Sequence, residues 1–131
     1  MDTKGTVLIV DDEQFIRQIL GRIVKREGYT VSEARDGIEA LEMLETETFH
    51  FVISDIKMPR MDGMELLNAI KAQHPKTKVL MVTGYAGDYT AWDVISAGAD
   101  HYITKPFKNT EIATTLRSLH TRSATKLPPG Q

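Results

Sequence analysis

The chain has 131 residues, 41% of them hydrophobic and 26% charged, with a formal net charge of −2 at pH 7. This length is enough for one domain with its own core, and the small net charge excludes a basic field that would recruit nucleic acid or an anionic membrane. The absence of cysteine excludes disulfides and thiolate metal sites. The first residues form neither a signal peptide nor a membrane span, so we expect a soluble protein of the cytoplasm.

Strand-like and helix-like patterns alternate along the chain. The apolar run at 7–10 is typical of a strand that is covered on both faces. Apolar residues then recur at 16, 19, 20 and 23, which is the spacing of an amphipathic helix, and Gly28 suits the C-terminal cap of that helix. Four further runs predict strands at 30–34, 49–54, 78–82 and 100–104.

A helix-like segment follows each of these later strands. The first begins after an Asp-Gly turn, and the second follows an irregular loop and ends before Pro75. The third has a weak pattern because glycines dilute it, and we expect Trp92 and Ile95 to mark its buried side, with Trp92 in a packing role. The last carries apolar residues at 112, 116 and 119 and is expected to fray near Arg122.

These alternating units predict an α/β domain. Five strands, each followed by a helix, imply a parallel sheet with helices on both faces, and the pattern leaves the strand order open. We assign the domain to residues 1–122. Residues 123–131 contain Pro-Pro-Gly and no apolar periodicity, which is typical of a flexible tail or the stub of a linker.

Polar residues stand at the carboxyl ends of four of the expected strands. They are Asp11, Asp12, Asp55, Thr83 and Lys105. Ligand sites in open parallel sheets lie just beyond the carboxyl ends of the strands, so these side chains are expected to meet in one crevice. Three carboxylates, a hydroxyl and an ammonium group suit a divalent metal ion and a transferable phosphoryl group.

Each of these residues also has an ordinary structural interpretation. Asp11 and Asp12 would serve in a turn, with one of them capping the helix that begins near residue 14. Asp55 would end a strand, but the irregular MPRMDG after it argues against an immediate cap and leaves it open as a metal ligand, a general base or a nucleophile. Thr83 would finish a strand and Lys105 would be solvated. Four strand ends that carry suitable groups favour a common site.

The chain resembles the receiver domain of bacterial two-component response regulators. The resemblance covers roughly residues 6–122. It rests on the acidic pair Asp11-Asp12, on Asp55 with the MPRMDG that follows it, on Thr83, and on the Lys-Pro-Phe at 105–107. It implies the flavodoxin-like fold, a doubly wound parallel sheet of five strands in the order 2-1-3-4-5 with five helices.

The resemblance also implies how a phosphoryl group would be handled. Asp55 would be the phosphoacceptor and would attack the phosphohistidine of a sensor histidine kinase or a phosphotransfer protein. Thr83 and Lys105 would hold the phosphoryl oxygens, so all three residues take part in the chemistry. The protein would then be a phosphoacceptor signalling domain that assists its own phosphorylation and dephosphorylation, and not an enzyme in the usual sense.

A metal site is implied by the same resemblance. Asp12 and Asp55 would bind Mg²⁺ or Mn²⁺, with Asp11 nearby, either as a ligand or through water. The backbone carbonyl of Lys57 would be a further ligand. This set agrees with the preference of magnesium for oxygen ligands.

Signalling is expected to run from the phosphorylated site to a partner surface. Thr83 would move toward the phosphoryl group, and Tyr102, which matches the switch aromatic of the family, would turn inward. That movement would reshape the face made by the fourth helix, fifth strand and fifth helix, where a downstream effector domain or protein would bind. Homodimerisation on phosphorylation is a further option, whereas nucleic acid and membrane are not expected partners.

The lifetime of the phosphorylated form depends on how water reaches it. Lys57 lies two residues after Asp55, and Tyr85 lies two residues after Thr83. Both side chains would flank the phosphoryl group, so we hypothesise a comparatively long-lived phosphoprotein.

Other functions that use similar residues fit this sequence less well. A hydrolase with an aspartyl-phosphate intermediate would carry a DxD nucleophile motif and a cap insertion, and neither is present. A flavodoxin-like nucleotide-binding protein would carry a glycine-rich loop after the first strand, where this chain has Asp-Asp-Glu. A pseudo-receiver, a binding scaffold that takes no phosphate, would be expected to lack one of the site residues, but all are present.

Overall fold

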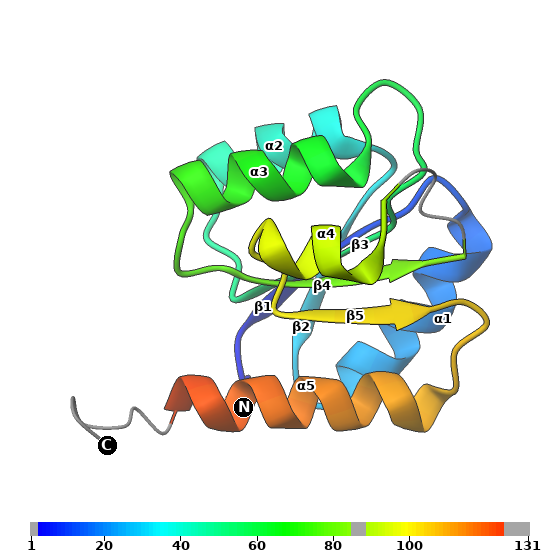
Figure 1. The fold of residues 1–131 in the computed structure, drawn as a ribbon. Helices are drawn as coiled ribbons and strands as arrows, with labels where there is room; N and C mark the ends of the chain where they lie inside the picture. Colours follow the sequence, from blue (N-terminus) through cyan, green and yellow to red (C-terminus); the bar gives the residue numbers. More distant parts are fainter. Residues whose placement is uncertain (1–2, 85–88, 125–131) are drawn as a thin grey trace, which may run out of the picture.

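The computed structural model describes residues 3–84 and 89–124 and contains one five-stranded parallel sheet (Figure 1). The strands are β1 (Thr6–Val10), β2 (Thr30–Ala34), β3 (Phe51–Ser54), β4 (Lys78–Thr83) and β5 (His101–Thr104). Their order across the sheet is β2-β1-β3-β4-β5, and every neighbouring pair is parallel. The flavodoxin-like order implied by the resemblance is therefore confirmed.

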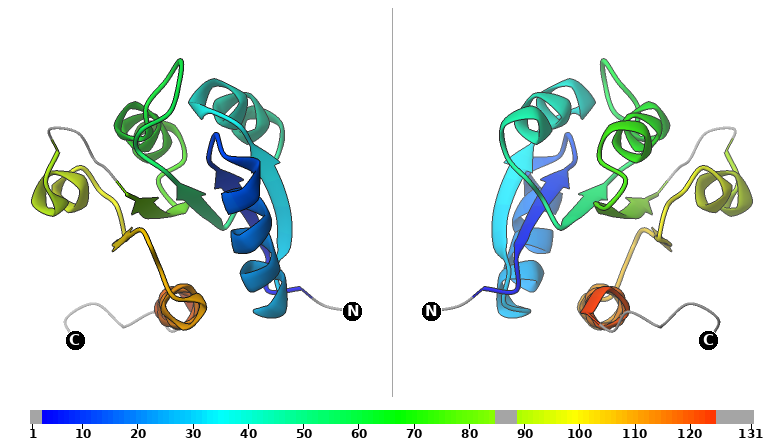
Figure 2. Two further views of the ribbon diagram at one scale, coloured as in Figure 1. Left: turned by 90° about the vertical axis from the view of Figure 1, so that its right-hand side faces the viewer. Right: turned by 90° about the vertical axis from the view of Figure 1, so that its left-hand side faces the viewer.

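Five helices cover the sheet on both faces. They are α1 (Gln14–Arg26), α2 (Gly37–Thr46), α3 (Gly63–Gln73), α4 (Ala91–Ser96) and α5 (Asn109–Ala124). Helices α1 and α5 lie on one face, and α2, α3 and α4 lie on the other, as the two side views show (Figure 2). Residues 125–131 of the expected tail lie outside the described residues.

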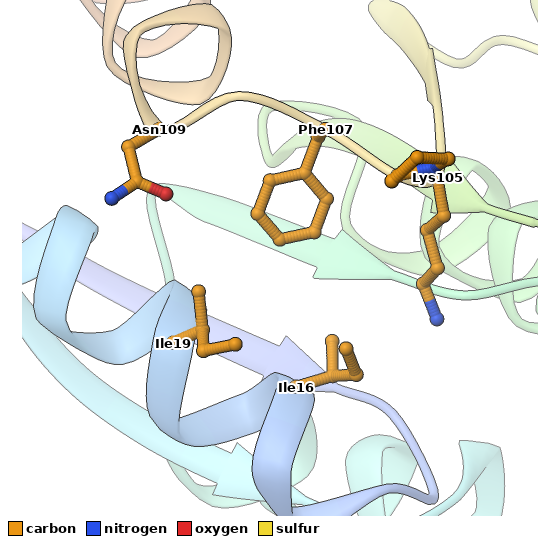
Figure 3. A pocket seen from close by; sticks show the side chains of 6 residues that line it. Ile16, Ile19, Lys105, Phe107 and Asn109 are labelled. Carbon is orange, nitrogen blue, oxygen red and sulfur yellow. The ribbon is translucent and has the colours of Figure 1, made fainter.

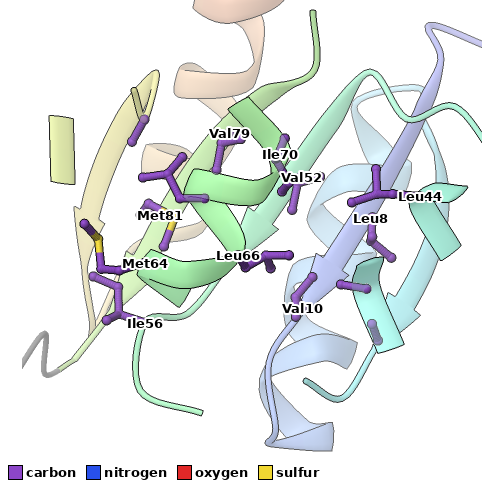
Figure 4. Close-up of a cluster of buried hydrophobic side chains, with 14 of the residues drawn as sticks. Leu8, Val10, Leu44, Val52, Ile56, Met64, Leu66, Ile70, Val79 and Met81 are labelled. Carbon is purple, nitrogen blue, oxygen red and sulfur yellow. The ribbon is translucent and has the colours of Figure 1, made fainter. Parts of the chain in front are cut away.

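Alternate residues of each strand supply the two halves of the core. In β1, Val7 and Ile9 pack toward α1 and α5, whereas Leu8 and Val10 pack toward α2 and α3 (Figure 4). All four are at most 1% exposed. This alternation has the period of two that a strand imposes on its side chains. Because both faces are covered, the run is apolar throughout, as its sequence predicted.

The prediction for the buried side of the fourth helix is wrong. Trp92 and Ile95 are 76% and 43% exposed, whereas Val94 is fully buried. Residues three apart lie on one helix face, so the sequence correctly placed Trp92 and Ile95 together. The buried face of α4 instead carries Val94, and Ala97, just after the helix, packs partly buried against the same core.

Candidate functional site

The polar strand ends meet at the carboxyl edge of the sheet, as the sequence predicted. They line an open hollow of about 330 Å³, here called the acidic hollow. Its lining residues are Asp12, Glu13, Asp55, Lys57, Thr83, Gly84 and Lys105. Four separate segments of the chain therefore contribute to one site.

Backbone hydrogen bonds that extend the sheet position the two buried carboxyl groups. The Asp11 N–H donates to the Ala34 carbonyl at 3.2 Å, and the Asp55 N–H donates to the Val10 carbonyl at 3.0 Å. Asp11 and Asp55 are only 1% and 7% exposed, whereas Asp12 is exposed. The sheet itself therefore determines where Asp11 and Asp55 leave the core.

The three aspartates form a cluster that suits a cation. One carboxylate oxygen from each of Asp11, Asp12 and Asp55 lies within 4.8 Å of the other two. These are hard oxygen donors, which magnesium and manganese prefer over nitrogen or sulfur. Lys57, two residues after Asp55, lines the same hollow. The donor set fits a divalent metal ion.

The Asp11 carboxylate also holds the turn that follows β1. It accepts a hydrogen bond from the Glu13 N–H at 2.9 Å. The N-cap of α1 is Glu13, whose side chain makes no capping hydrogen bond, so neither aspartate caps this helix. Asp11 therefore serves in a turn, but its second oxygen remains directed at the site, where it meets Lys105.

Lys105 connects the two buried carboxylates. Its Nζ lies 2.9 Å from Asp11 Oδ2 and 2.9 Å from Asp55 Oδ2. Its backbone N–H donates to the Thr83 carbonyl at 2.9 Å, which ties the loop after β5 to the end of β4. The Lys105–Pro106 peptide is cis. An ammonium group thus stands where negative charge is concentrated.

The charged groups of the site influence one another's protonation. Burial raises the pKa of Asp11 above its ordinary value, and the Glu13 N–H and the Lys105 ammonium only partly offset that rise. Burial lowers the pKa of Lys105, but hydrogen bonds and charges from Asp55 and Asp11 outweigh it and raise this pKa overall. The lysine therefore stays charged at neutral pH, while the charged form of Asp11 costs folding energy.

The residues of the expected switch lie on neighbouring strands. Thr83 is buried at the end of β4 and is in register with Thr104 of β5. Tyr102 is in register with Met81, is half-buried, and packs against the core on the α3 and α4 side. Tyr85 lies outside the described residues.

Two arginines near the site were missed by the sequence analysis. Arg17 is buried and donates from Nη1 to the Asp11 carbonyl at 2.7 Å and from Nε to Glu33 at 2.9 Å. Arg60 binds Asp36 with two hydrogen bonds of 2.9 Å each. The position of Arg17, one turn before Leu20 on the apolar face of α1, could have indicated that it is buried. No pattern near Arg60 in the sequence indicates its contact with Asp36.

A second, apolar hollow adjoins the acidic one. It has a volume of about 410 Å³ and lies between the start of α1 and the loop that leads into α5 (Figure 3). Ile16 and Ile19 face Phe107 across it, and Lys105 lines both hollows. Phe15, on the same turn of α1, is 69% exposed. An apolar surface therefore borders the carboxylates.

Within residues 3–84 and 89–124, none of the helices has both the length and the apolar character that a membrane span requires.

Comparisons with known proteins agree with this geometry. A family model described as a response regulator receiver domain matches residues 7–117. The chain is 33% identical over 125 residues to the alkaline phosphatase synthesis transcriptional regulatory protein PhoP of Bacillus subtilis, which covers 95% of this chain and 52% of that protein. It is 39% identical over 117 residues to the sensor kinase CckA of Brucella abortus, which covers 88% of this chain and 12% of that protein. The chain thus spans about half or less of these two relatives.

A solved structure shares nearly the whole fold. It is the crystal structure of a CheY-like response regulator receiver domain protein from Methanospirillum hungatei, with a TM-score of 0.85 and 35% sequence identity. The match covers 91% of this chain and 95% of that one. Sequence and fold therefore point to the same family.

Proposed function

Because the chain belongs to the family of response regulator receiver domains, we propose that Asp55 accepts a phosphoryl group from the phosphohistidine of a sensor histidine kinase or phosphotransfer protein. A receiver domain is a signalling domain controlled by phosphorylation, not a classical enzyme. The observation that carries the proposal is the position of Lys105, whose ammonium touches both Asp11 and Asp55. This lysine would neutralise the charge that gathers at the site during transfer.

The transfer needs little covalent chemistry from the protein. A carboxylate oxygen of Asp55 forms a bond to phosphorus, while the bond between phosphorus and the imidazole nitrogen of the donor breaks and the nitrogen keeps the electron pair. Lys105 and the Thr83 hydroxyl donate hydrogen bonds to the phosphoryl oxygens. Such reactions depend mainly on positioning and on charge stabilisation.

A divalent metal ion completes the site in this proposal. Asp11, Asp12, Asp55 and the backbone carbonyl of Lys57 would hold Mg²⁺ or Mn²⁺, as the close approach of the three carboxylates supports. When bound, the ion neutralises charge on the carboxylates and on the phosphoryl group. Asp55 can then act as nucleophile although another carboxylate lies beside it.

The donor must reach Asp55 through the mouth of the acidic hollow. The apolar hollow with Ile16, Ile19 and Phe107 lies directly beside it and shares Lys105. Exposed Phe15 extends this surface along α1. These side chains would contact the phosphodonor, because an apolar patch next to a charged site favours a protein partner.

The output runs from Thr83 to Tyr102 and on to the face of α4, β5 and α5. The phosphoryl group would draw in Thr83, and Tyr102 on the adjacent strand would turn inward. Trp92 on α4 is 76% exposed and supports a partner face there. The partner would be an effector domain or protein, or a second copy of the chain.

The receiver domain would occupy residues 1–122 and the tail 123–131, with the cytoplasm as the predicted location. The hypothesis of a long-lived phosphoprotein rests on Lys57 and Tyr85. A pseudo-receiver scaffold remains the alternative function, and the experiment below separates the two.

The test is intact mass after incubation with acetyl phosphate and Mg²⁺. The wild type should gain the mass of one phosphoryl group, only with the metal ion present, and Asp55→Asn should gain none. Asp62→Asn is the matched control, because Asp62 caps α3 outside the hollow and asparagine can also cap. A folded wild type that gains no mass would reject the phosphoacceptor role and favour the pseudo-receiver.

A further inference from the structure

We propose that the ion pair between Arg60 and Asp36 positions the loop between β3 and α3 for metal binding. This inference rests on the proposed function, in which the Lys57 carbonyl in that loop is a metal ligand. Arg60 and Asp36 do not touch the metal site themselves. They would act by holding the loop in one conformation, so both are positioning residues.

The loop contains a strained turn. Among the described residues, Arg60 is the only non-glycine residue with a positive φ, at 68°. The Met61 N–H donates to the Pro59 carbonyl at 2.8 Å, a hydrogen bond that spans a single residue. This bond and the sign of φ match the γ-turn form that is rare and strained. Such a turn persists only where its surroundings hold it in place.

The side chain of the strained residue supplies that restraint. Arg60 Nε donates to Asp36 Oδ2 and Nη2 donates to Asp36 Oδ1, both at 2.9 Å. Asp36 is in turn fixed, because its Oδ1 accepts the Glu39 N–H at 2.9 Å and thereby caps α2. A two-pronged bond from a planar guanidinium group to a fixed carboxylate sets orientation as well as distance. The loop is therefore tied to the start of α2.

Packing on either side of the ion pair leaves the loop little freedom. Met61 lies against Gly37, where an added Cβ would stand 2.8 Å from its Cγ. At the base of the loop, the Gly63 N–H donates to the Ile56 carbonyl at 2.7 Å. A side chain at Gly63 would collide with the backbone carbonyl of Asp55. The chain from Asp55 to Gly63 thus leaves the sheet and returns to the same point.

Lys57 lies within this loop, between Asp55, the proposed phosphoacceptor, and the γ-turn at Arg60. A carbonyl that is held in place before the ion arrives loses less entropy on binding than a mobile one. Without the tie at Arg60, the γ-turn would relax and the outer part of the loop would move. The expected consequence is weaker binding of the metal ion while the fold remains intact.

Calorimetric titration of the unphosphorylated full chain with Mg²⁺ tests this inference. Arg60→Gly removes the ion pair and also relieves the strain, because glycine adopts a positive φ freely. Its Mg²⁺ affinity should fall about tenfold, in line with the effect of partners that orient metal ligands. Asp36→Asn, which can still cap α2, should show a smaller loss. Arg35→Ala is the matched control, because Arg35 is exposed and its guanidinium pairs with Glu39, four residues along the chain.

The outcomes separate a positioning role from a structural one. If Arg60 and Asp36 act together, the double variant Arg60→Gly/Asp36→Asn will bind no more weakly than Arg60→Gly alone. Variants that lose stability in urea but bind Mg²⁺ like the wild type would overturn the inference and leave the proposed function standing. A wild type that binds no Mg²⁺ would instead reject the metal site of the proposed function, and this inference with it.

Discussion

Two sets of residues are buried to a similar extent: those in the middle of the strands and those just past the carboxyl ends of the strands. The first set lies among apolar side chains, and the second lies among charged groups. Ile53 and Leu80 are paired in register, fully buried, and part of one cluster of apolar side chains. Two residues after Ile53, Asp55 is 7% exposed, and Asp11 on the neighbouring segment is 1% exposed. Burial of apolar surface stabilises the fold, whereas burial of a carboxylate costs free energy unless partners offset it.

This difference separates the source of stability from the source of chemistry. The apolar interior of the sheet stabilises the domain. Part of that stability offsets the free energy that it costs to keep charged groups out of water at the carboxyl edge. Lys105 offsets some of the cost by contacting both carboxylates. Substitutions in the two regions should therefore change stability in opposite directions.

The largest expected effect comes from the interior. Ile53→Ala should lower the free energy of unfolding by about 2–5 kcal/mol, because it removes buried methyl groups and leaves a cavity in the middle of β3. Ile53→Val, at the same position, should cost only about 0.5–1.5 kcal/mol. Urea denaturation at pH 7 measures both. If Ile53→Ala lowered the free energy of unfolding by less than the range expected for Ile53→Val, the strand interior would not be the main source of stability.

A smaller effect of opposite sign is expected at the edge. Because burial raises the pKa of Asp11, the folded protein holds more protons than the unfolded chain between pH 3.8 and the raised pKa. Stability therefore falls as the pH rises through this window and stays lower above it. Asp11→Asn removes the effect and should stabilise the protein at pH 7 by roughly 1 kcal/mol. Denaturation curves at pH 7 and below pH 3.8 should show the gain only at the higher pH.

Asp36 provides the matched control with the opposite sign. The Glu39 N–H lowers the pKa of Asp36; burial opposes that hydrogen bond, and the Arg60 guanidinium adds to it. The stability that Asp36 contributes is therefore present above pH 3.8 and is lost as the pH falls through the lowered pKa. Asp36→Asn should thus destabilise the protein at pH 7. If Asp11→Asn also lost stability at pH 7, its carboxylate would be a net stabilising group and the contrast would fail.

The sequence predicted the strand ends better than the connections between them. Apolar runs that end at Asp55 or Thr83 are local signals, and parallel strands bring such ends to one edge. The strand order had no local signal and came from the family resemblance alone. The pairing of Arg60 with Asp36 joins segments that are 24 residues apart, so no pattern within either segment indicates it.

The smallest expected effect concerns Trp92, where the contrast between buried and exposed residues appears within one helix. Trp92→Ala should change the free energy of unfolding by less than about 0.5 kcal/mol, because its side chain is 76% exposed. Val94→Ala, on the buried face of α4, should cost about 1–3 kcal/mol although it removes far fewer atoms. A small effect of this kind would mean that the fold does not depend on Trp92, so that its ring is available to bind a partner. A loss above about 1 kcal/mol for Trp92→Ala would instead show that its ring packs on the domain, and the partner face on α4, β5 and α5 would lose its main support.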